Sequence, residues 1–327
     1  MEDKKYWIWL SQIEGLGAKR KQELLEIFKK PENIYYLKRY ELLKIKGIGE
    51  TLANNILDKK IRGDLQKHIE YMIKNNIDII SIYDKEYPKI LKKIYDYPIS
   101  LYIKGNKKIL DRNSIAIVGC RETSEYGEKT AKYFSYNLTK QNYNIVSGLA
   151  KGIDSFAHIG NICAIKEYKN QNSKPSNNKY GKTIAVVGNG LDIVYPKENE
   201  RLLEEIIKSG GAVISEYPLG TKIKKINFPA RNRIISGLCE KTIVVEAKEK
   251  SGTLITVDYA LEQGRDVYVV PGNINSINSV GTNELIKQGA KIATTFLDVL
   301  WATLNLLFIF TNWTRIISTN MFIFFTF

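Results

Sequence analysis

Residues 114–127 of this chain read SIAIVGCRETSEYG, which is a short apolar run, a glycine and a polar loop. The apolar run predicts a buried strand at 114–119, and the residues from 127 to 142 predict the helix that follows it. The same alternation continues toward the carboxyl end, and it predicts an α/β fold with a doubly wound, mainly parallel sheet. The further expected strands lie at 144–148, 183–188, 212–216, 242–246 and 267–271, and the further helices at 153–166, 198–208 and 252–263.

The first 78 residues have a helical pattern and predict a small all-α domain of the helix-hairpin-helix or SAM-like kind. Two segments in it, IEGLGA at 13–18 and IKGIGE at 45–50, share a glycine–apolar–glycine turn followed by a helical run. The glycines allow a tight turn and expose backbone N–H groups at a helix N-terminus, where a phosphate can bind. Two interpretations stay open: the turns contact nucleic acid without reading its sequence, or they serve only the packing of helices.

We therefore expect three parts: a helical domain at 1–78, a sheet domain at 79–300 and an atypical apolar tail at 301–327. Residues 168–180 are polar and of low complexity, which indicates a surface insertion in the sheet domain. The tail contains one charged residue, Arg315, but polar residues interrupt its middle, so that we expect no membrane anchor. We expect instead that the tail is not the native continuation of the fold, as a shifted reading frame would produce.

The composition excludes several classes of protein. Cys120, Cys163 and Cys239 are too widely spaced for a disulfide framework or a cysteine zinc site, and two histidines make a histidine metal centre improbable. No signal-peptide pattern opens the chain, so we expect a soluble, cytoplasmic protein with no metal and no cofactor. The formal net charge of +14 favours a polyanionic partner, although an AT-rich genome would also give a lysine-rich composition.

One segment concentrates this charge: TKIKKINFPARNR at 221–233 contains five basic side chains and no acidic one. Pro229 is expected at the first position of a helix that carries Arg231, Asn232 and Arg233. The two arginines point in different directions and would hold successive anionic groups. Phe228 is interpreted either as an exposed platform for a base or as a core residue; a cation beside an aromatic ring is typical of sites for single-stranded nucleic acid.

Four glycine-containing loops follow predicted strands and should meet at the carboxyl edge of the sheet, where ligands bind in such folds. The first loop adds the guanidinium of Arg121, and the second adds the amine of Lys151. The candidate phosphate-binding residues of the four loops are Gly119, Ser124, Gly127, Gly148, Gly188, Gly190, Ser251, Gly252 and Thr253.

Enzymatic motifs are missing from these loops. The first loop lacks the GxGxxG spacing of a dinucleotide site, and Ser176 stands where a P-loop ending at 181–183 would need its leading glycine. His158 lies on an apolar helix face and is interpreted as a packing or hydrogen-bonding residue. We expect no catalytic residue.

Seven segments, spread in order over roughly residues 80–300, resemble the DNA-processing protein A (DprA/Smf) family. They read VGCRETSEYG, SGLAKGIDSFAH, KTIAVVGNGLDIVYPKEN, ISEYPLG, FPARNRIISGLC, VVEAKEKSGTLITVDYALEQGRDVYVVPG and GTNELIKQGA. The resemblance implies a Rossmann-like, non-enzymatic protein that dimerises, binds single-stranded DNA and helps to load the RecA recombinase in natural transformation, the DNA uptake of competence. The DNA pocket that it implies consists of Arg121, Lys151, Lys225, Phe228, Arg231, Asn232 and Arg233.

The chain departs from the family pattern at two places. Cys120 replaces the serine of the usual Gly-Ser-Arg loop, and the tail does not resemble the winged-helix domain in which many members end. The alternative function is that of a nucleotide-processing enzyme of the lysine-decarboxylase-like group. Such enzymes need a glutamate where this chain has Thr256, so the sequence favours the recombination mediator.

Overall fold

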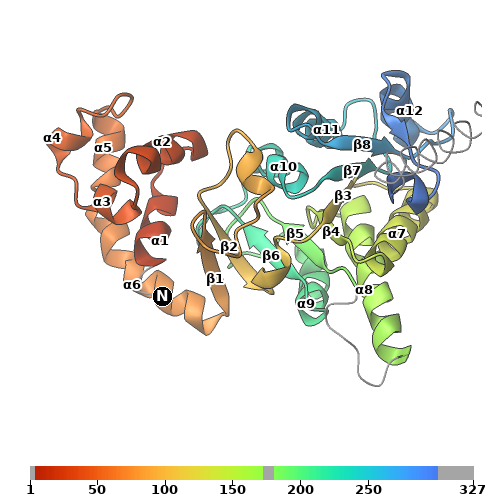
Figure 1. The fold of residues 1–327 in the computed structure, drawn as a ribbon, viewed down its shortest axis with the longest axis horizontal. Helices are drawn as coiled ribbons and strands as arrows, with labels where there is room; N and C mark the ends of the chain where they lie inside the picture. Colours follow the sequence, from red (N-terminus) through yellow and green to blue (C-terminus); the bar gives the residue numbers. More distant parts are fainter. Residues whose placement is uncertain (1–3, 172–179, 301–327) are drawn as a thin grey trace, which may run out of the picture.

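A sheet of nine strands lies at the centre of the computed structural model, which describes residues 4–171 and 180–300 (Figure 1). The strand order is β1-β2-β6-β5-β4-β3-β7-β8-β9. The pairs from β6 to β9 are parallel, whereas β2 is antiparallel to both of its neighbours, β1 and β6. The strands are β1 (Ile77–Ser81), β2 (Ser100–Gly105), β3 (Ser114–Val118), β4 (Asn144–Ser147), β5 (Thr183–Val186), β6 (Ala212–Ser215), β7 (Lys241–Val244), β8 (Asp266–Val269) and β9 (Lys291–Ile292).

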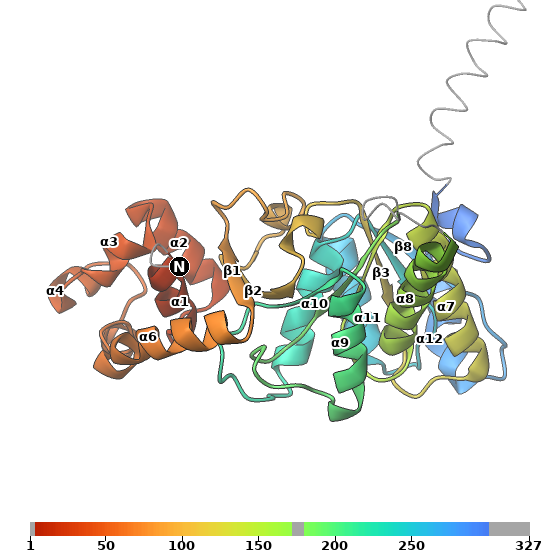
Figure 2. The same ribbon diagram turned by 90° about the horizontal axis from the view of Figure 1, so that it is seen from below.

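Helices cover both faces of this sheet (Figures 1 and 2). The order of the strands reverses after β6, because the chain crosses from β6 back to β7 on the other side of β3. The helices before the reversal therefore cover one face, and those after it cover the opposite face. The first group is α7 (Glu125–Lys140), α8 (Ile153–Gln171) and α9 (Glu200–Lys208), and the second is α10 (Asn227–Gly237), α11 (Gly252–Glu262) and α12 (Val280–Lys287).

The alternation of side chains along β3 shows how the two layers are held. Ile115 and Ile117 are fully buried in the cluster that contains Phe134 of α7. Ala116 and Val118 belong to the cluster on the other face, together with Val257 of α11. A strand that is apolar on both sides is typical of a central parallel strand. The predicted α/β class with a doubly wound, mainly parallel sheet is confirmed.

Several boundaries differ from those expected. Gly119, Gly148 and Gly188 come after their strands rather than at the end of them, since ladder pairing stops before each loop turns away. Pro229 is the third residue of α10 and not the first, because the helix already begins at Asn227. The tail at 301–327 and residues 172–179 of the predicted insertion lie outside the described residues.

The helical region packs beside β1 at the edge of the sheet (Figure 1). Its buried side chains, such as Trp9, belong to the same hydrophobic cluster as Tyr102 of β2. A hydrogen bond of 2.7 Å between the hydroxyls of Ser11 and Tyr102 adds a polar link. The division into domains at residue 78 stays a prediction. The helices are α1 (Lys5–Gln12), α2 (Ala18–Phe28), α3 (Pro31–Tyr35), α4 (Arg39–Leu42), α5 (Glu50–Ile56) and α6 (Lys59–Lys74), and short 3-10 helices occur at Leu91–Lys93, Lys107–Ile109, Lys197–Asn199 and Ile277–Ser279.

Each of the two glycine–apolar–glycine turns of this region accepts a hydrogen bond from the helix that follows the other turn. Arg20 of α2 donates a hydrogen bond of 2.7 Å to the carbonyl of Lys46 in the second turn. Asn55 of α5 donates one of 3.0 Å to the carbonyl of Glu14 in the first turn. Glu50 begins α5 and pairs with Arg39, so a carboxylate already lies at this helix N-terminus. These contacts support the packing interpretation, and nucleic-acid contact by the turns stays a prediction.

Candidate nucleic-acid interface

A pocket of about 760 Å³ lies beside the carboxyl ends of β3 and β7. These strands are neighbours between which the direction of winding reverses, and this is the place where open α/β sheets bind ligands. The loop after β3, the first turns of α10 and the loop from β7 to α11 form its walls. The predicted residues among its lining are Gly119, Arg121, Lys225, Phe228, Arg231, Asn232, Ser251, Gly252 and Thr253.

Two aromatic rings lie in this pocket. The ring of Phe228 is half-buried, and its centre is 5.6 Å from that of Tyr195, with 35° between the ring planes. The guanidinium carbon of Arg121 is 5.6 Å from the centre of the Phe228 ring. Phe228 is thus a partly accessible ring in contact with a cation. Its burial is intermediate between that of an exposed platform and that of a core residue, the two interpretations of the sequence. Tyr195 was missed, although its position in the loop after β5 placed it at the same edge of the sheet.

Basic side chains surround the rings. Arg121, Lys225 and Lys250 are exposed, and none of them forms a salt bridge with another described residue. Lys248 also lines the pocket, where it forms a salt bridge of 2.6 Å with Glu122. Lys248 and Lys250 were not predicted; the signal for both was their place in the loop between β7 and α11. The positive charge available here attracts a polyanion.

The N-terminus of α11 opens into the pocket. The hydroxyl of Ser251 caps this helix by accepting a hydrogen bond of 3.2 Å from the Thr253 N–H. A side chain at Gly252 would meet no atom within 4 Å, so the backbone is open on this side. Free N–H groups at a helix N-terminus carry partial positive charge and bind anions. Of the predicted phosphate loops, this one leaves a helix N-terminus open to the pocket, and its contact with phosphate stays a prediction.

Arg231 is anchored inside the protein. Its side chain donates a hydrogen bond of 2.6 Å to the carbonyl of Gly148 and another to the carbonyl of Val186, and 4% of the residue is exposed. A side chain at Gly148 would collide with this guanidinium. Burial lowers the pKa of Arg231 to about 10, so it is still charged at neutral pH. Arg231 therefore fixes α10 to the ends of β4 and β5.

Two further glycine positions serve contacts within the protein. Asn227 donates a hydrogen bond of 2.9 Å to the carbonyl of Gly188, and the N–H of Gly190 donates one of 3.0 Å to the carbonyl of Thr221. Like Gly148, these residues are not among the pocket lining. The expectation that all four loops present phosphate-binding groups to one pocket is corrected, because α10 packs over two of them.

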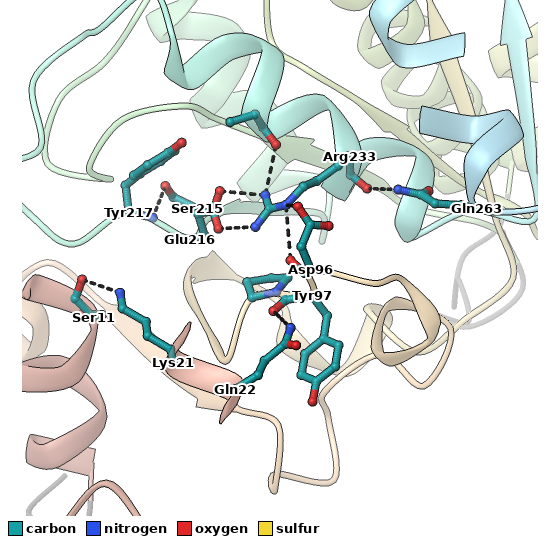
Figure 3. Close-up of polar contacts among 12 residues, drawn as sticks. Ser11, Lys21, Gln22, Asp96, Tyr97, Ser215, Glu216, Tyr217, Arg233 and Gln263 are labelled. Carbon is teal, nitrogen blue, oxygen red and sulfur yellow. Dashed lines mark hydrogen bonds and ion pairs between the residues drawn. The ribbon is translucent and has the colours of Figure 1, made fainter. Parts of the chain in front are cut away.

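Arg233 is not among the residues that line the pocket, and its guanidinium contacts Glu216 and Asp96 (Figure 3). Its guanidinium donates two hydrogen bonds, of 2.7 and 2.6 Å, to the carboxylate of Glu216, and its Nε lies 2.8 Å from a carboxylate oxygen of Asp96. The side chain is 5% exposed. The expectation that Arg231 and Arg233 hold successive phosphates is corrected, because tertiary contacts bury both guanidinium groups.

The other expected residues have different surroundings. Asn232 lines the pocket and is partly exposed. Lys151 lies outside the lining and forms a salt bridge of 2.5 Å with Glu198, so its contact with DNA stays a prediction. Ser124 and Gly127 also lie outside the lining, because Glu246 covers the N-terminus of α7.

His158 of α8 is buried against the first residue of β5. Its Nδ1 lies 2.6 Å from the hydroxyl of Thr183. Burial, with a smaller contribution from the charge of Arg231, lowers the pKa of His158 to about 3. The imidazole is therefore neutral at physiological pH, and the interpretation as a packing and hydrogen-bonding residue is confirmed.

Residues 4–171 and 180–300 contain no group of three or more histidine, cysteine, aspartate or glutamate residues that could hold a metal ion. In these ranges no helix has the length and apolar character needed to cross a bilayer.

A doubly wound sheet with a basic, aromatic pocket at its switch point is typical of α/β proteins that bind anionic ligands, and the comparisons with known proteins identify the family. The family model described as DNA recombination-mediator protein A matches residues 78–303. DNA processing protein DprA of Streptococcus pneumoniae is 46% identical over 220 residues, which are 67% of this chain and 72% of that protein. Protein Smf of a Synechocystis species is 34% identical over 291 residues, which are 88% of this chain and 69% of that protein.

Two solved structures agree with this assignment. The X-ray structure of DNA processing protein A from Streptococcus pneumoniae has a TM-score of 0.75 and 36% identity, and the match covers 90% of this chain and 96% of that one. A structure that concerns the single-stranded DNA binding mode of DNA processing protein A from Helicobacter pylori has a TM-score of 0.59 and 27% identity, with 70% and 96% covered. The chain belongs to the DNA recombination-mediator protein A family, as the resemblance implied.

Proposed function

We propose that this protein binds single-stranded DNA in the pocket beside β3 and β7. The observation that carries the proposal is the arrangement of Phe228, Tyr195 and Arg121, in which two tilted rings and a cation share one wall. A base can stack on an accessible ring, while its phosphates meet Lys225, Lys250 and the N-terminus of α11. Stacking tolerates every base, so we expect little sequence preference.

A single strand fits these groups better than a duplex does. The flat faces of paired bases are already stacked on one another, and the pocket would need them unstacked. The wall of the pocket contains loops and the end of α10, which is anchored by Arg231, rather than a projecting helix that could enter a major groove. The Helicobacter pylori relative, for which a single-stranded DNA binding mode is described, supports the same choice.

The proposal includes no catalytic step. Asp154 and Glu122 are the acidic residues among the described lining. Asp154 accepts hydrogen bonds from the N–H groups of Gly148 and Ala150, and Glu122 is paired with Lys248. Both carboxylates thus have partners within the protein, and Thr256 stands where the nucleotide-processing enzymes need a glutamate.

The proposed cellular role is that of a cytoplasmic recombination mediator, which protects incoming DNA during natural transformation and helps to load a RecA-type recombinase. We propose that it acts as a homodimer. Ile274 and Ile277, between β8 and α12, are 86% and 69% exposed, and such apolar side chains are typical of a surface that a partner covers. Stimulation of strand exchange by a RecA-type recombinase, and the molar mass in solution, test these two proposals separately.

One binding experiment tests the central proposal. Fluorescence anisotropy would compare a labelled oligothymidylate with a duplex of equal length at two salt concentrations. We expect tighter binding of the single strand, with an affinity that falls as salt rises because counterions are released. Equal affinity for both forms at both salt concentrations would contradict the proposal.

A further inference from the structure

We propose that Glu246 determines which class of ligand this fold accepts. Its carboxylate occupies the N-terminus of α7, where the phosphate of a nucleotide would otherwise bind, and thereby excludes nucleoside phosphates from that helix. The part of the proposal that concerns the DNA strand rests on the proposed function; the exclusion of nucleoside phosphates does not.

The helix that Glu246 covers is the one that follows β3 at the switch point. In dinucleotide-binding folds of this architecture, the helix after the first parallel strand holds the pyrophosphate at its N-terminus. In this chain the corresponding site is the N-terminus of α7. Ser124 caps this helix by accepting a hydrogen bond of 3.1 Å from the Gly127 N–H. The architecture therefore offers an anion site here.

That site contains an anion from the protein itself. The N–H of Ser124 donates a hydrogen bond of 3.1 Å to Oε2 of Glu246, and the hydroxyl of Ser124 donates one to Oε1. A side chain at Gly127 would collide with this carboxylate, so the glycine makes the space that Glu246 fills. Two oxygens held by a backbone amide and a hydroxyl at a helix N-terminus reproduce the contacts that phosphate oxygens make there.

The charge of Glu246 is balanced by the helix rather than by a cation. The residue is 2% exposed, and it forms no salt bridge with any described residue. A buried carboxylate without a basic partner is costly unless other groups stabilise it. The donors at Ser124 and the positive end of the α7 dipole supply that stabilisation, which explains why the Glu246 carboxylate can be buried.

The contrast with α11 gives the functional meaning. Both helices begin at the switch point, yet the N-terminus of α11 opens into the pocket at Gly252, while that of α7 is closed by Glu246. Because Glu246 fills the N-terminus of α7, a nucleotide cannot place its phosphate there as it does in dinucleotide-binding folds. A strand, which is held by stacking and by several phosphates, does not need the closed end.

The test removes the carboxylate and asks whether phosphate takes its place. Thermal unfolding of wild type, E246Q and E246A would be followed with increasing inorganic phosphate, and then with deoxyadenosine monophosphate. We expect both ligands to raise the Tm of E246A by about 2 °C or more beyond any rise in wild type. E246Q keeps the size of the side chain, so phosphate and deoxyadenosine monophosphate should change its Tm no more than they change the Tm of wild type.

A second substitution provides the matched control. In G127A/E246A the new methyl group refills the space, so the additional response to phosphate should disappear. Equal responses of E246A and wild type would overturn the proposal, as would a response that survives in G127A/E246A. Should E246A be unfolded without ligand, E246S carries the same comparison, and failure of phosphate to raise its Tm beyond that of wild type would equally overturn it. Oligothymidylate binding by wild type is measured separately, so a failure of the proposed function is distinguishable.

Discussion

The guanidinium of Arg121 lies over the ring of Phe228, 5.6 Å from its centre, although Arg121 belongs to the loop after β3 and Phe228 to the first turn of α10. The contact places an exposed positive charge beside the surface on which a base would stack. A nucleotide entering the pocket meets both groups together, so that phosphate attraction and base stacking act at one point.

The stacking contribution can be separated from that of charge at Phe228. We expect Phe228→Ala to weaken binding of oligothymidylate by ~1–3 kcal/mol, the usual size of one lost base–aromatic stack. The dependence of affinity on salt should stay nearly unchanged because no charge is removed. Fluorescence anisotropy measures both quantities, and Phe228→Trp, which keeps a ring, is the control. An unchanged affinity of folded Phe228→Ala would exclude the ring from the site.

Lys225 should contribute to DNA binding through its charge rather than through stacking. If its ammonium contacts a phosphate, Lys225→Ala removes one released counterion, and the slope of log affinity against log salt becomes shallower by ~0.7. Lys208→Ala is the matched control, since Lys208 is exposed on α9, on the opposite face of the sheet from α10 (Figure 1). Identical slopes for the two variants would place the phosphate contact elsewhere.

Arg233 is expected to affect stability rather than DNA binding. Arg233→Ala leaves the carboxylate of Glu216 without its partner in a largely buried site, which typically costs ~3–5 kcal/mol of the free energy of unfolding. Urea denaturation measures this loss. Lys224→Ala, an exposed substitution in the same segment, should change stability by about 0.5 kcal/mol or less. A stable Arg233→Ala protein that no longer binds DNA would contradict this expectation and would show that Arg233 belongs to the binding site.

His158 makes stability depend on pH in a defined direction. Its pKa is about 3 in the folded protein against an ordinary 6.5, so between these values the unfolded chain binds the additional proton. The free energy of unfolding should therefore fall as pH falls below 6.5, by at most ~1.4 kcal/mol per pH unit from this residue. We expect His158→Asn to show a weaker pH dependence between pH 6.5 and 4.5 in urea denaturation. Parallel profiles for variant and wild type would show that the imidazole does not titrate differently on folding.

The sheet could be predicted from the sequence because each central strand is a short apolar run ending near a glycine, a pattern that depends only on neighbouring residues. Lys225 and Phe228 could be placed at the pocket for a similar reason: they lie just before and within the first turn of a helix at the carboxyl edge of the sheet. Arg121 followed from its position directly after the first parallel strand.

The burial of the two arginines of α10 could not be predicted in this way. In the sequence, Arg231 and Arg233 belong to one basic segment, but their partners are the carbonyls of Gly148 and Val186 and the carboxylates of Glu216 and Asp96. These partners come from four other parts of the chain. Which basic side chains remain free is decided by tertiary packing, and local composition does not contain that information.

The hydrogen bonds of Arg20 and Asn55 couple the local unfolding of the two helical pairs in the N-terminal region. Arg20 stabilises the second turn and Asn55 the first, so neither helical pair keeps its full set of bonds without the other. Fluctuations that break one contact weaken the other, which makes the two pairs a single cooperative unit in amide hydrogen exchange. Any shortened version of this protein should therefore retain both turns or neither.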